Sequence, residues 1–163
     1  MPKTHQLQIQ ITVFENENEL SKQDLFLLNE ARKASERAYA PYSNFWVGAA
    51  IELQNGEVIW GSNQENAAYP SGLCAERTAI FSASVRFPNE IIKTIAIAAK
   101  PKGSNDFIAI SPCGSCRQVM SEYENKQEKP IRMIMEGADK SIYILTSIAD
   151  LLPLKFAKES LNL

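Results

Sequence analysis

The stretch Ile91-Ile92-Lys93-Thr94-Ile95-Ala96-Ile97-Ala98-Ala99 is the part of the sequence around which the other elements can be arranged. It is rich in apolar and β-branched residues, which is typical of a strand buried on both faces. Residues 74–85, before it, are helix-forming. Earlier still, residues 46–53 and 57–61 flank Gln54-Asn55-Gly56, and an Asn-Gly step is a strong hairpin signal. The order is therefore hairpin, helix and buried strand.

The segments that follow continue this alternation of strands and helices. In chain order we expect a short strand at 107–110, a helix at 113–123, strands at 131–136 and 141–146, and a short helix from Ser147 to Pro153. This order predicts an α/β fold, with a mixed sheet of about five strands covered by helices on its faces. In such folds ligands tend to bind at helix N-termini beyond the ends of strands.

The N-terminal part is expected to add one more strand. Four apolar residues alternate there with polar neighbours: Leu7, Ile9, Ile11 and Val13. Alternation of this kind predicts a strand with one buried face. After a polar run, a helix is expected to open at Ser21, a residue type favoured at the N-cap. We therefore divide the chain into an N-terminal extension, residues 1–20, and one domain, residues 21–163.

Composition narrows the range of functions. The length of 163 residues suits one domain. The chain has 17 Lys and Arg residues against 19 Asp and Glu residues. The resulting net charge of −2 and pI near 5.5 disfavour nucleic acid as a partner, because nucleic-acid binders usually carry a basic face.

The hydropathy pattern gives no sign of a membrane partner. No apolar run approaches the roughly 18 residues that a transmembrane helix needs, and the alternating start of the chain differs from the continuous apolar block of a signal peptide. We therefore expect a soluble, cytoplasmic protein. An odd number of cysteines in such a chain argues against a disulfide framework.

The cysteines occur in two motifs, Cys74-Ala75-Glu76 and Pro112-Cys113-Gly114-Ser115-Cys116. Each motif opens a helix-forming segment, and a helix N-terminus stabilises a thiolate. Three thiolates leave the fourth position of a tetrahedral zinc ion open for water, and zinc lowers the pKa of such water toward about 7. Glu76, two residues after Cys74, is placed to accept a proton from that water. A C-x-E followed by P-C-x-x-C with a Cys₃ zinc site is a signature of zinc deaminases.

Other interpretations remain open for parts of this pattern. Cys113 and Cys116 alone have the C-x-x-C spacing of a redox pair. A structural zinc site needs a fourth ligand, and the only histidine of the chain is His5, near the N-terminus. Glu76 alone is also explained as a first-turn acid that interacts with the helix dipole. Each alternative explains one part of the pattern, whereas the deaminase interpretation explains all four residues.

The sequence resembles the cytidine deaminases, specifically the small-subunit class with three cysteine ligands. The resemblance extends from about Ala38 to Phe156. It rests on four motifs in the right order: Tyr39-Ala40-Pro41-Tyr42-Ser43-Asn44-Phe45-Trp46-Val47-Gly48-Ala49-Ala50, Asn63-Gln64-Glu65-Asn66-Ala67, Cys74-Ala75-Glu76-Arg77-Thr78-Ala79 and Ser111-Pro112-Cys113-Gly114-Ser115-Cys116-Arg117-Gln118. Residues 1–20 look like an addition before the usual start of the family, and no function is carried over to them.

The resemblance implies how a nucleoside would be bound. Asn63 and Glu65 are expected to hold the sugar hydroxyls, for which an amide and a carboxylate together offer donor and acceptor atoms. Phe45 is expected to lie against the pyrimidine ring, and the backbone N–H of Ala75 is expected to donate to the carbonyl of the base. Phe156 resembles the C-terminal aromatic residue that a neighbouring subunit inserts into the site, in a homotetramer with shared active sites.

The resemblance also implies the reaction, which belongs to pyrimidine salvage. Cytidine or 2′-deoxycytidine and water would give uridine or deoxyuridine and ammonia, with one zinc ion per subunit held by Cys74, Cys113 and Cys116. Zinc-bound hydroxide would attack C4, while Glu76 carries the proton from water to N3 and later to the leaving amine. Zinc with three thiolates has a net charge of −1, and the Arg77 guanidinium would withdraw charge from the sulfurs and restore Lewis acidity.

Three rival functions are weighed against this one. Blasticidin S deaminases share the C-A-E and P-C-x-x-C motifs, but the Asn63 and Glu65 pair favours a nucleoside. A nucleic-acid editing deaminase is disfavoured by the acidic charge balance. A zinc-stabilised binding domain without catalytic activity is the non-enzymatic alternative, and a spectroscopic assay with cytidine separates it from an enzyme.

Overall fold

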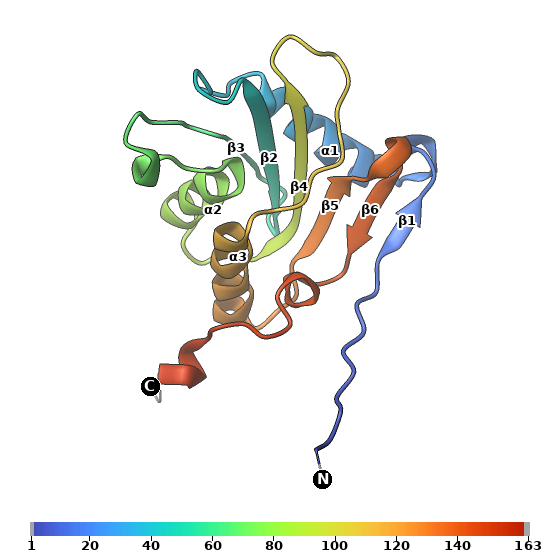
Figure 1. The fold of residues 1–163 in the computed structure, drawn as a ribbon, viewed down its shortest axis with the longest axis vertical. Coiled ribbons are helices and arrows are strands. Elements are labelled where there is room, and N and C mark those ends of the chain that lie inside the picture. Colours follow the sequence, from blue (N-terminus) through green and yellow to red (C-terminus); the bar gives the residue numbers. More distant parts are fainter. Residues whose placement is uncertain (1, 162–163) are drawn as a thin grey trace.

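Strand β4 (Ile92–Pro101) lies in the middle of a six-stranded sheet, as the apolar run predicts (Figure 1). The structure is a computed structural model that describes residues 2–161. The other strands are β1 (Thr12–Phe14), β2 (Phe45–Leu53), β3 (Val58–Ser62), β5 (Arg132–Glu136) and β6 (Ile142–Leu145). Their order across the sheet is β1-β6-β5-β4-β2-β3. Only the β4–β5 pair of this sheet is parallel, so the sheet is mixed, as expected.

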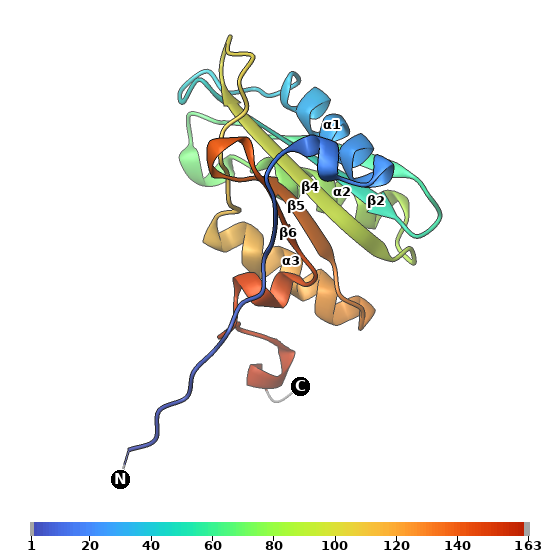
Figure 2. The same cartoon turned by 90° about the vertical axis from the view of Figure 1, so that its right-hand side faces the viewer.

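The helices cover both faces of the sheet. Helix α1 packs on one face, and α2 and α3 pack on the other (Figures 1 and 2). The helices are α1 (Lys22–Ser35), α2 (Ala75–Arg86) and α3 (Gly114–Gln127). Five short 3₁₀ helices complete the described chain: η1 (Glu17–Glu19), η2 (Tyr69–Ser71), η3 (Ala138–Lys140), η4 (Ile148–Leu151) and η5 (Lys158–Leu161). Helix α1 begins as predicted, because the Ser21 hydroxyl accepts a hydrogen bond from the backbone N–H of Asp24 at 3.1 Å.

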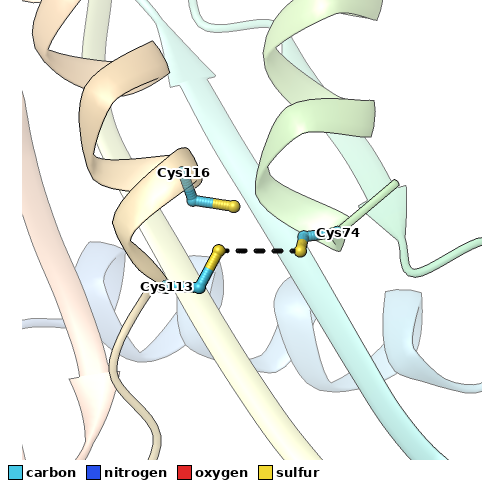
Figure 3. Close-up of side chains that lie close together, drawn as sticks. All are labelled: Cys74, Cys113 and Cys116. Carbon is cyan, nitrogen blue, oxygen red and sulfur yellow. Dashed lines mark hydrogen bonds between the residues drawn. The ribbon is translucent and has the colours of Figure 1, made fainter. Parts of the chain in front are cut away.

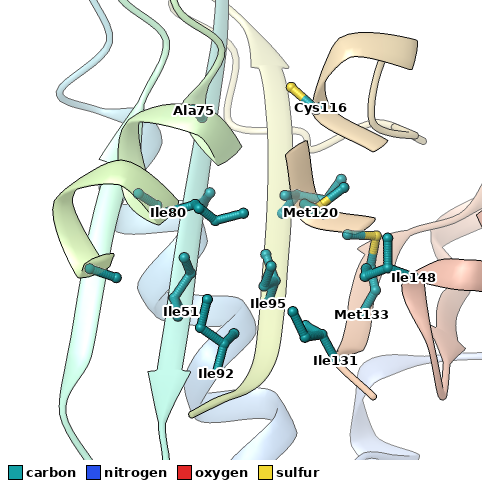
Figure 4. Close-up of a cluster of buried hydrophobic side chains, with 14 of the residues drawn as sticks. Ile51, Ala75, Ile80, Ile92, Ile95, Cys116, Met120, Ile131, Met133 and Ile148 are labelled. Atoms are coloured by element: carbon teal, nitrogen blue, oxygen red, sulfur yellow. The ribbon is translucent and has the colours of Figure 1, made fainter. Parts of the chain in front are cut away.

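The two faces of β4 carry side chains of different size. Ile95 and Ile97 belong to the large apolar cluster between the sheet and helices α2 and α3, part of which Figure 4 shows. Ala96 and Ala98 belong to the cluster beneath α1. Because side chains alternate along a strand, each helix layer meets only one of these two sets. The small set lets α1 lie close to the sheet, whereas the large set fills the wider space beneath α2 and α3.

Two glycines permit close contacts between helices and sheet. A Cβ atom on Gly48 in β2 would lie 2.1 Å from the carbonyl oxygen of Ala31 in α1. A Cβ atom on Gly61 in β3 would lie 2.3 Å from the carbonyl oxygen of Ala75 and 2.4 Å from the backbone nitrogen of Ala79. Gly61 therefore sets how closely the first turn of α2 approaches the sheet.

Two expected strands differ from the structure. The strand expected at residues 7–13 is wrong in extent, because β1 covers only Thr12–Phe14 and pairs with the four-residue β6. The four alternating apolar residues are exposed instead of forming a buried face: Leu7, Ile9, Ile11 and Val13. The strand expected at 107–110 is reduced to a single bridge between Ala99 and Ile108. For residues 7–11 the neighbouring edge is too short, because β6 ends at Leu145. Among residues 2–161, no helix is long and apolar enough to span a bilayer.

Replacing Gly61 by Ala should push α2 away from β3 and lower the free energy of unfolding by about 3 kcal/mol, the upper end of typical overpacking effects, because the clash is with backbone. Gly114→Ala is the matched control, since no heavy atom lies within 4 Å of its Cβ position. Urea unfolding monitored by circular dichroism measures both changes. Equal stability of Gly61→Ala and the unaltered protein would contradict the close approach.

Candidate metal centre and substrate cleft

Two helices begin at cysteines, and their first turns face each other. Cys74 is the N-cap of α2, Cys113 is the N-cap of α3, and Cys116 lies in the first turn of α3. The three Sγ atoms all lie within 4.8 Å of one another, and those of Cys74 and Cys113 are 3.9 Å apart (Figure 3). The structure thus brings together the three cysteines that the sequence predicts as metal ligands.

The donor set fits zinc. Tetrahedral zinc with Zn–S bonds of about 2.3 Å holds its thiolates roughly 3.8 Å apart, and Cys74 and Cys113 are already separated by 3.9 Å. Within residues 2–161, the cluster includes no histidine or carboxylate as a fourth donor. A zinc ion held here would therefore keep one position for water or substrate, as catalytic zinc sites do. The inclusion of Cys74 argues against a redox pair made only of Cys113 and Cys116.

The surroundings of Cys74 favour its thiolate form. Hydrogen bonding to Cys116 and to Arg77 lowers the pKa of Cys74 to about 5, despite partial burial. The Arg77 Nη2 atom lies 3.7 Å from the Cys74 sulfur. The same hydrogen bond with Cys74, together with burial, raises the pKa of Cys116. Negative charge is thus concentrated at the start of α2, where the helix dipole and Arg77 both stabilise it.

Glu76 lies next to the cysteines in the second position of α2. Only 4% of its surface is exposed. Burial raises the pKa of Glu76, and hydrogen bonds from its own backbone N–H and from Cys116 only partly offset this rise. A carboxyl group whose pKa is raised is better suited to accept a proton from water than an ordinary carboxylate, and it can release that proton again.

A cleft of about 490 Å³ lies beside Cys74 and Arg77. This volume falls in the range of roughly 300–1,000 Å³ that is usual for small-molecule sites. Asn63 and Glu65 also line the cleft, and both come from the loop that follows β3. The rings of Tyr42 and Tyr69 lie in the same lining, with centroids 6.2 Å apart in an edge-to-face arrangement.

Asn63 is fixed by the first residues of β2. Its Oδ1 atom accepts from the backbone N–H of Val47, and its Nδ2 atom donates to the carbonyl of Phe45, both at 2.9 Å. These two bonds set the orientation of the side-chain amide. The second N–H of Nδ2 makes no hydrogen bond to the described residues and remains available as a donor.

Glu65 is fixed by the loop that precedes β2. Its Oε2 atom accepts from the backbone N–H groups of Tyr42 and Ser43, at 2.9 and 3.2 Å. Hydrogen bonds from the Ser43 side chain and the Tyr42 backbone lower the pKa of Glu65. The carboxylate is therefore anionic at neutral pH, and Oε1 makes no hydrogen bond within the described part of the chain. Asn63 and Glu65 together offer a free donor and a free acceptor.

The structure leaves the predicted aromatic residues outside this cleft. Phe45 is half-buried at the start of β2, beside Asn63, and Phe156 is 57% exposed in the C-terminal segment. Of the described residues, neither of these two lines the cleft. Ala75 is fully buried, and as the first residue of α2 its N–H has no partner within the helix.

Several residues that shape this region have no role that their sequence pattern indicates. Tyr42 and Ser43 hold Glu65 through their backbone, and Arg117 and Gln118 donate hydrogen bonds to the C-terminal segment. All four lie within the motifs shared with the cytidine deaminases, and this position is the one sequence signal that they carry. Tyr69 lies outside those motifs, and its place in the cleft follows only from the three-dimensional fold.

Known proteins with similar sequences and folds are deaminases. The family described as "Cytidine and deoxycytidylate deaminase zinc-binding region" matches residues 21–129. A cytidine deaminase of Sporosarcina psychrophila is 40% identical over 136 residues, which cover 83% of this chain and 93% of that relative. A cytidine deaminase of Halalkalibacterium halodurans is also 40% identical over 136 residues, covering 83% of this chain and 96% of that relative.

A solved structure supports the same similarity at the level of the fold. The crystal structure of cytidine deaminase from Burkholderia pseudomallei superposes with a TM-score of 0.67 at 39% sequence identity. The match covers 84% of this chain and 100% of that chain. Residues 1–20 precede the range that the family match covers.

Replacing Cys116 by Ala should remove the metal and lower thermal stability together, because metal binding contributes to the free energy of folding. Elemental analysis and a thermal melt measure the two effects. Ser115→Ala is the control, since its side chain is exposed between the two cysteines of the motif. Active, unaltered protein without stoichiometric zinc would contradict the site.

Proposed function

The chain belongs to the cytidine and deoxycytidylate deaminase family, and on this premise we propose that it catalyses the hydrolytic deamination of cytidine, 2′-deoxycytidine or both. Water is consumed, and uridine or deoxyuridine and ammonia are released. The observation that carries the proposal is the cluster of three thiols within 4.8 Å, next to the buried Glu76 and a cleft. Neither a two-thiol redox pair nor a closed structural zinc site uses all of these features.

Cys74, Cys113 and Cys116 would hold one zinc ion per chain. When bound, zinc supplies a Lewis acid that makes water nucleophilic near neutral pH. Arg77 donates toward the Cys74 sulfur and so withdraws negative charge from the thiolates. The helix N-termini of α2 and α3 stabilise the same charge.

Glu76 carries the protons of the reaction. It accepts a proton from the attacking water and delivers it to N3 of the pyrimidine, while the oxygen of that water adds to C4. It then transfers the second proton of that water to the amino group, and the C4–N bond breaks as ammonia leaves. Its burial beside Cys116 keeps bulk water away from these transfers and places the carboxylate near the thiols.

The remaining residues position the nucleoside. Asn63 and Glu65 bind the sugar hydroxyls through the free N–H and the free Oε1 described above, and the Ala75 N–H donates to the carbonyl of the base. Phe45, at the start of β2 beside Asn63, is proposed to lie against the pyrimidine ring.

The charges in the cleft favour a nucleoside over a nucleotide. Of the described residues that line it, Arg77 is the one cation, and it is engaged with Cys74. Glu65 adds a negative charge at the sugar end. A phosphate would therefore meet repulsion and no free cation. An activity screen over cytidine, deoxycytidine, cytosine and dCMP tests whether nucleosides are preferred to the nucleotide.

We also propose that the protein assembles as a homotetramer with shared active sites. Leu154 and Phe156 are 87% and 57% exposed in a single chain. Exposed apolar residues close together in sequence are typical of a contact surface. Phe156 would then complete the pocket of a neighbouring subunit and exclude water from it.

Glu76→Gln should keep the fold and the metal but lower kcat by at least about 10²–10⁴-fold, the range for loss of one general acid–base group. Glu65→Gln is the matched comparison, because it makes the same chemical change at the sugar end and should mainly raise KM. Steady-state kinetics on zinc-loaded variants measures both. Near-normal turnover of zinc-loaded Glu76→Gln would overturn the mechanism.

Phe156→Ala should raise KM, because Phe156 is proposed to contact the substrate in the pocket of a neighbouring subunit. Zinc content should stay unchanged, because Phe156 is not a metal ligand. Coexpression with Glu76→Gln provides the test of shared sites. A hybrid site that takes Glu76 from one chain and Phe156 from the other is intact, so mixed oligomers should regain low-KM activity. If mixing restores nothing, or if the active species is a monomer by light scattering, the shared site is wrong.

A further inference from the structure

The segment that follows β6 runs along helix α3 and is fixed to it mainly by side chains of that helix (Figure 1). Glu124 holds its beginning, since its carboxylate accepts from the Ser147 hydroxyl and from the backbone N–H groups of Ile148 and Ala149, at 2.8 to 3.1 Å. Beyond η4 the segment has no helix or strand until η5. Other contacts must therefore determine its course there.

Backbone hydrogen bonds and apolar packing do little to fix residues 153–157, the stretch between η4 and η5. Pro153 has no backbone N–H, and no N–H of residues 154–157 donates to a backbone carbonyl in the described structure. Leu154 and Phe156 are exposed, so apolar packing within one chain does not hold them. Ala157 is buried, and Lys155 Nζ donates to Asn125 Oδ1 of α3 at 2.6 Å.

Arg117 connects the segment to the metal-binding turn. Its Nε atom donates to the carbonyl of Pro112 at 2.8 Å, and its Nη2 atom donates to the Ser111 hydroxyl at 2.8 Å. Its Nη1 atom donates to the carbonyl of Leu151 at 3.1 Å. The Pro112 carbonyl belongs to the peptide bond that leads into Cys113. One half-buried guanidinium thus links the backbone of a metal-binding residue to the start of the C-terminal stretch.

Gln118, the next residue on α3, reaches the aromatic residue itself. Its Nε2 atom donates to the backbone carbonyl of Phe156 at 2.8 Å. Gln118 lies two residues after Cys116, so the same two helical turns carry the metal-binding thiols and this contact.

We infer that Arg117 and Gln118 are positioning residues that fix Phe156 relative to the metal-binding turn of α3. The inference rests on the proposed function in that Phe156 is taken to complete a neighbouring site. Each chain would then present its aromatic residue from the same helix that carries two of its own metal ligands. A shift of that helix moves both its own metal site and the residue that it offers to its neighbour.

Gln118→Ala is the direct test, with Glu122→Ala as the matched control. Glu122 is exposed on the same helix, and Ala is the best helix former, so both variants should keep α3 intact. Loss of one neutral hydrogen bond predicts a KM about three- to tenfold higher in Gln118→Ala, with kcat within about twofold. Glu122→Ala should leave both constants unchanged. A fall in kcat with an unchanged KM would overturn the positioning role.

NMR order parameters and a double variant separate this inference from the role of Phe156. The backbone amides of residues 154–158 should show lower order parameters in Gln118→Ala than in the unaltered protein, whatever Phe156 does. Unchanged order parameters would overturn the tether. In a Phe156→Ala background, Gln118→Ala should raise KM no further. If Phe156→Ala alone leaves KM unchanged, the proposed role of Phe156 fails, and the order parameters still decide the tether.

Arg117→Gln should give a different pattern, because Arg117 contacts both the metal-binding turn and the C-terminal segment. It should raise KM as Gln118→Ala does, and it should also weaken zinc binding by about 10-fold or more, as loss of a residue that supports a metal ligand typically does. A chelator competition assay measures zinc affinity in both variants. Unchanged zinc affinity in Arg117→Gln would overturn its link to the metal-binding turn.

Discussion

The contact between the first turns of α2 and α3 is the constraint on which the site depends. Each helix presents unpaired backbone N–H groups and the positive end of its dipole at a cysteine. Two such ends directed at one point would repel each other without negative charge between them, and the thiolates supply that charge. The close approach of α2 to β3 at Gly61 fixes one of these ends, and the crossover from β4 through α3 to β5 fixes the other.

Glu76 and Arg77 lie on either side of this charge. The carboxyl group of Glu76 is buried near Cys116, and its pKa is raised by desolvation and by the negative charge of Cys74, while the guanidinium of Arg77 approaches Cys74. Neighbouring residues on one helical turn therefore act in opposite electrostatic directions. The proposed chemistry needs both, because the proton carrier must be basic enough to accept a proton, while the negative charge on the thiolates must be reduced.

The parts of the fold that were predictable from the sequence depend on local signals. The apolar run of β4, the Asn-Gly turn with Gly56 at φ 88° and the Ser21 cap each specify their structure within a few residues. The three cysteines are predictable as one cluster because their two motifs lie at helix starts. Residues 7–11 have an equally clear local pattern, but a strand also needs a partner, and the length of β6 is not encoded nearby.

The site was predictable to a similar extent and for the same reason. Asn63 and Glu65 were identified by resemblance, yet the contacts that orient them come from β2 and from Tyr42 and Ser43, some 20 residues away. The contact from Gln118 to the Phe156 carbonyl spans 38 residues and involves a backbone atom. No residue type signals such a bond, since every residue has the same carbonyl.

The unequal faces of the sheet have a consequence for how related sequences can diverge. Beneath α2 and α3, large flexible side chains such as Ile80, Met120 and Met133 can exchange volume with one another, so compensated substitutions are open to this layer. Beneath α1, Gly48, Ala96 and Ala98 are already so small that they offer no side-chain volume for a compensating reduction. Sequence drift should therefore accumulate beneath α2 and α3, while positions 48, 96 and 98 beneath α1 stay nearly fixed in side-chain size.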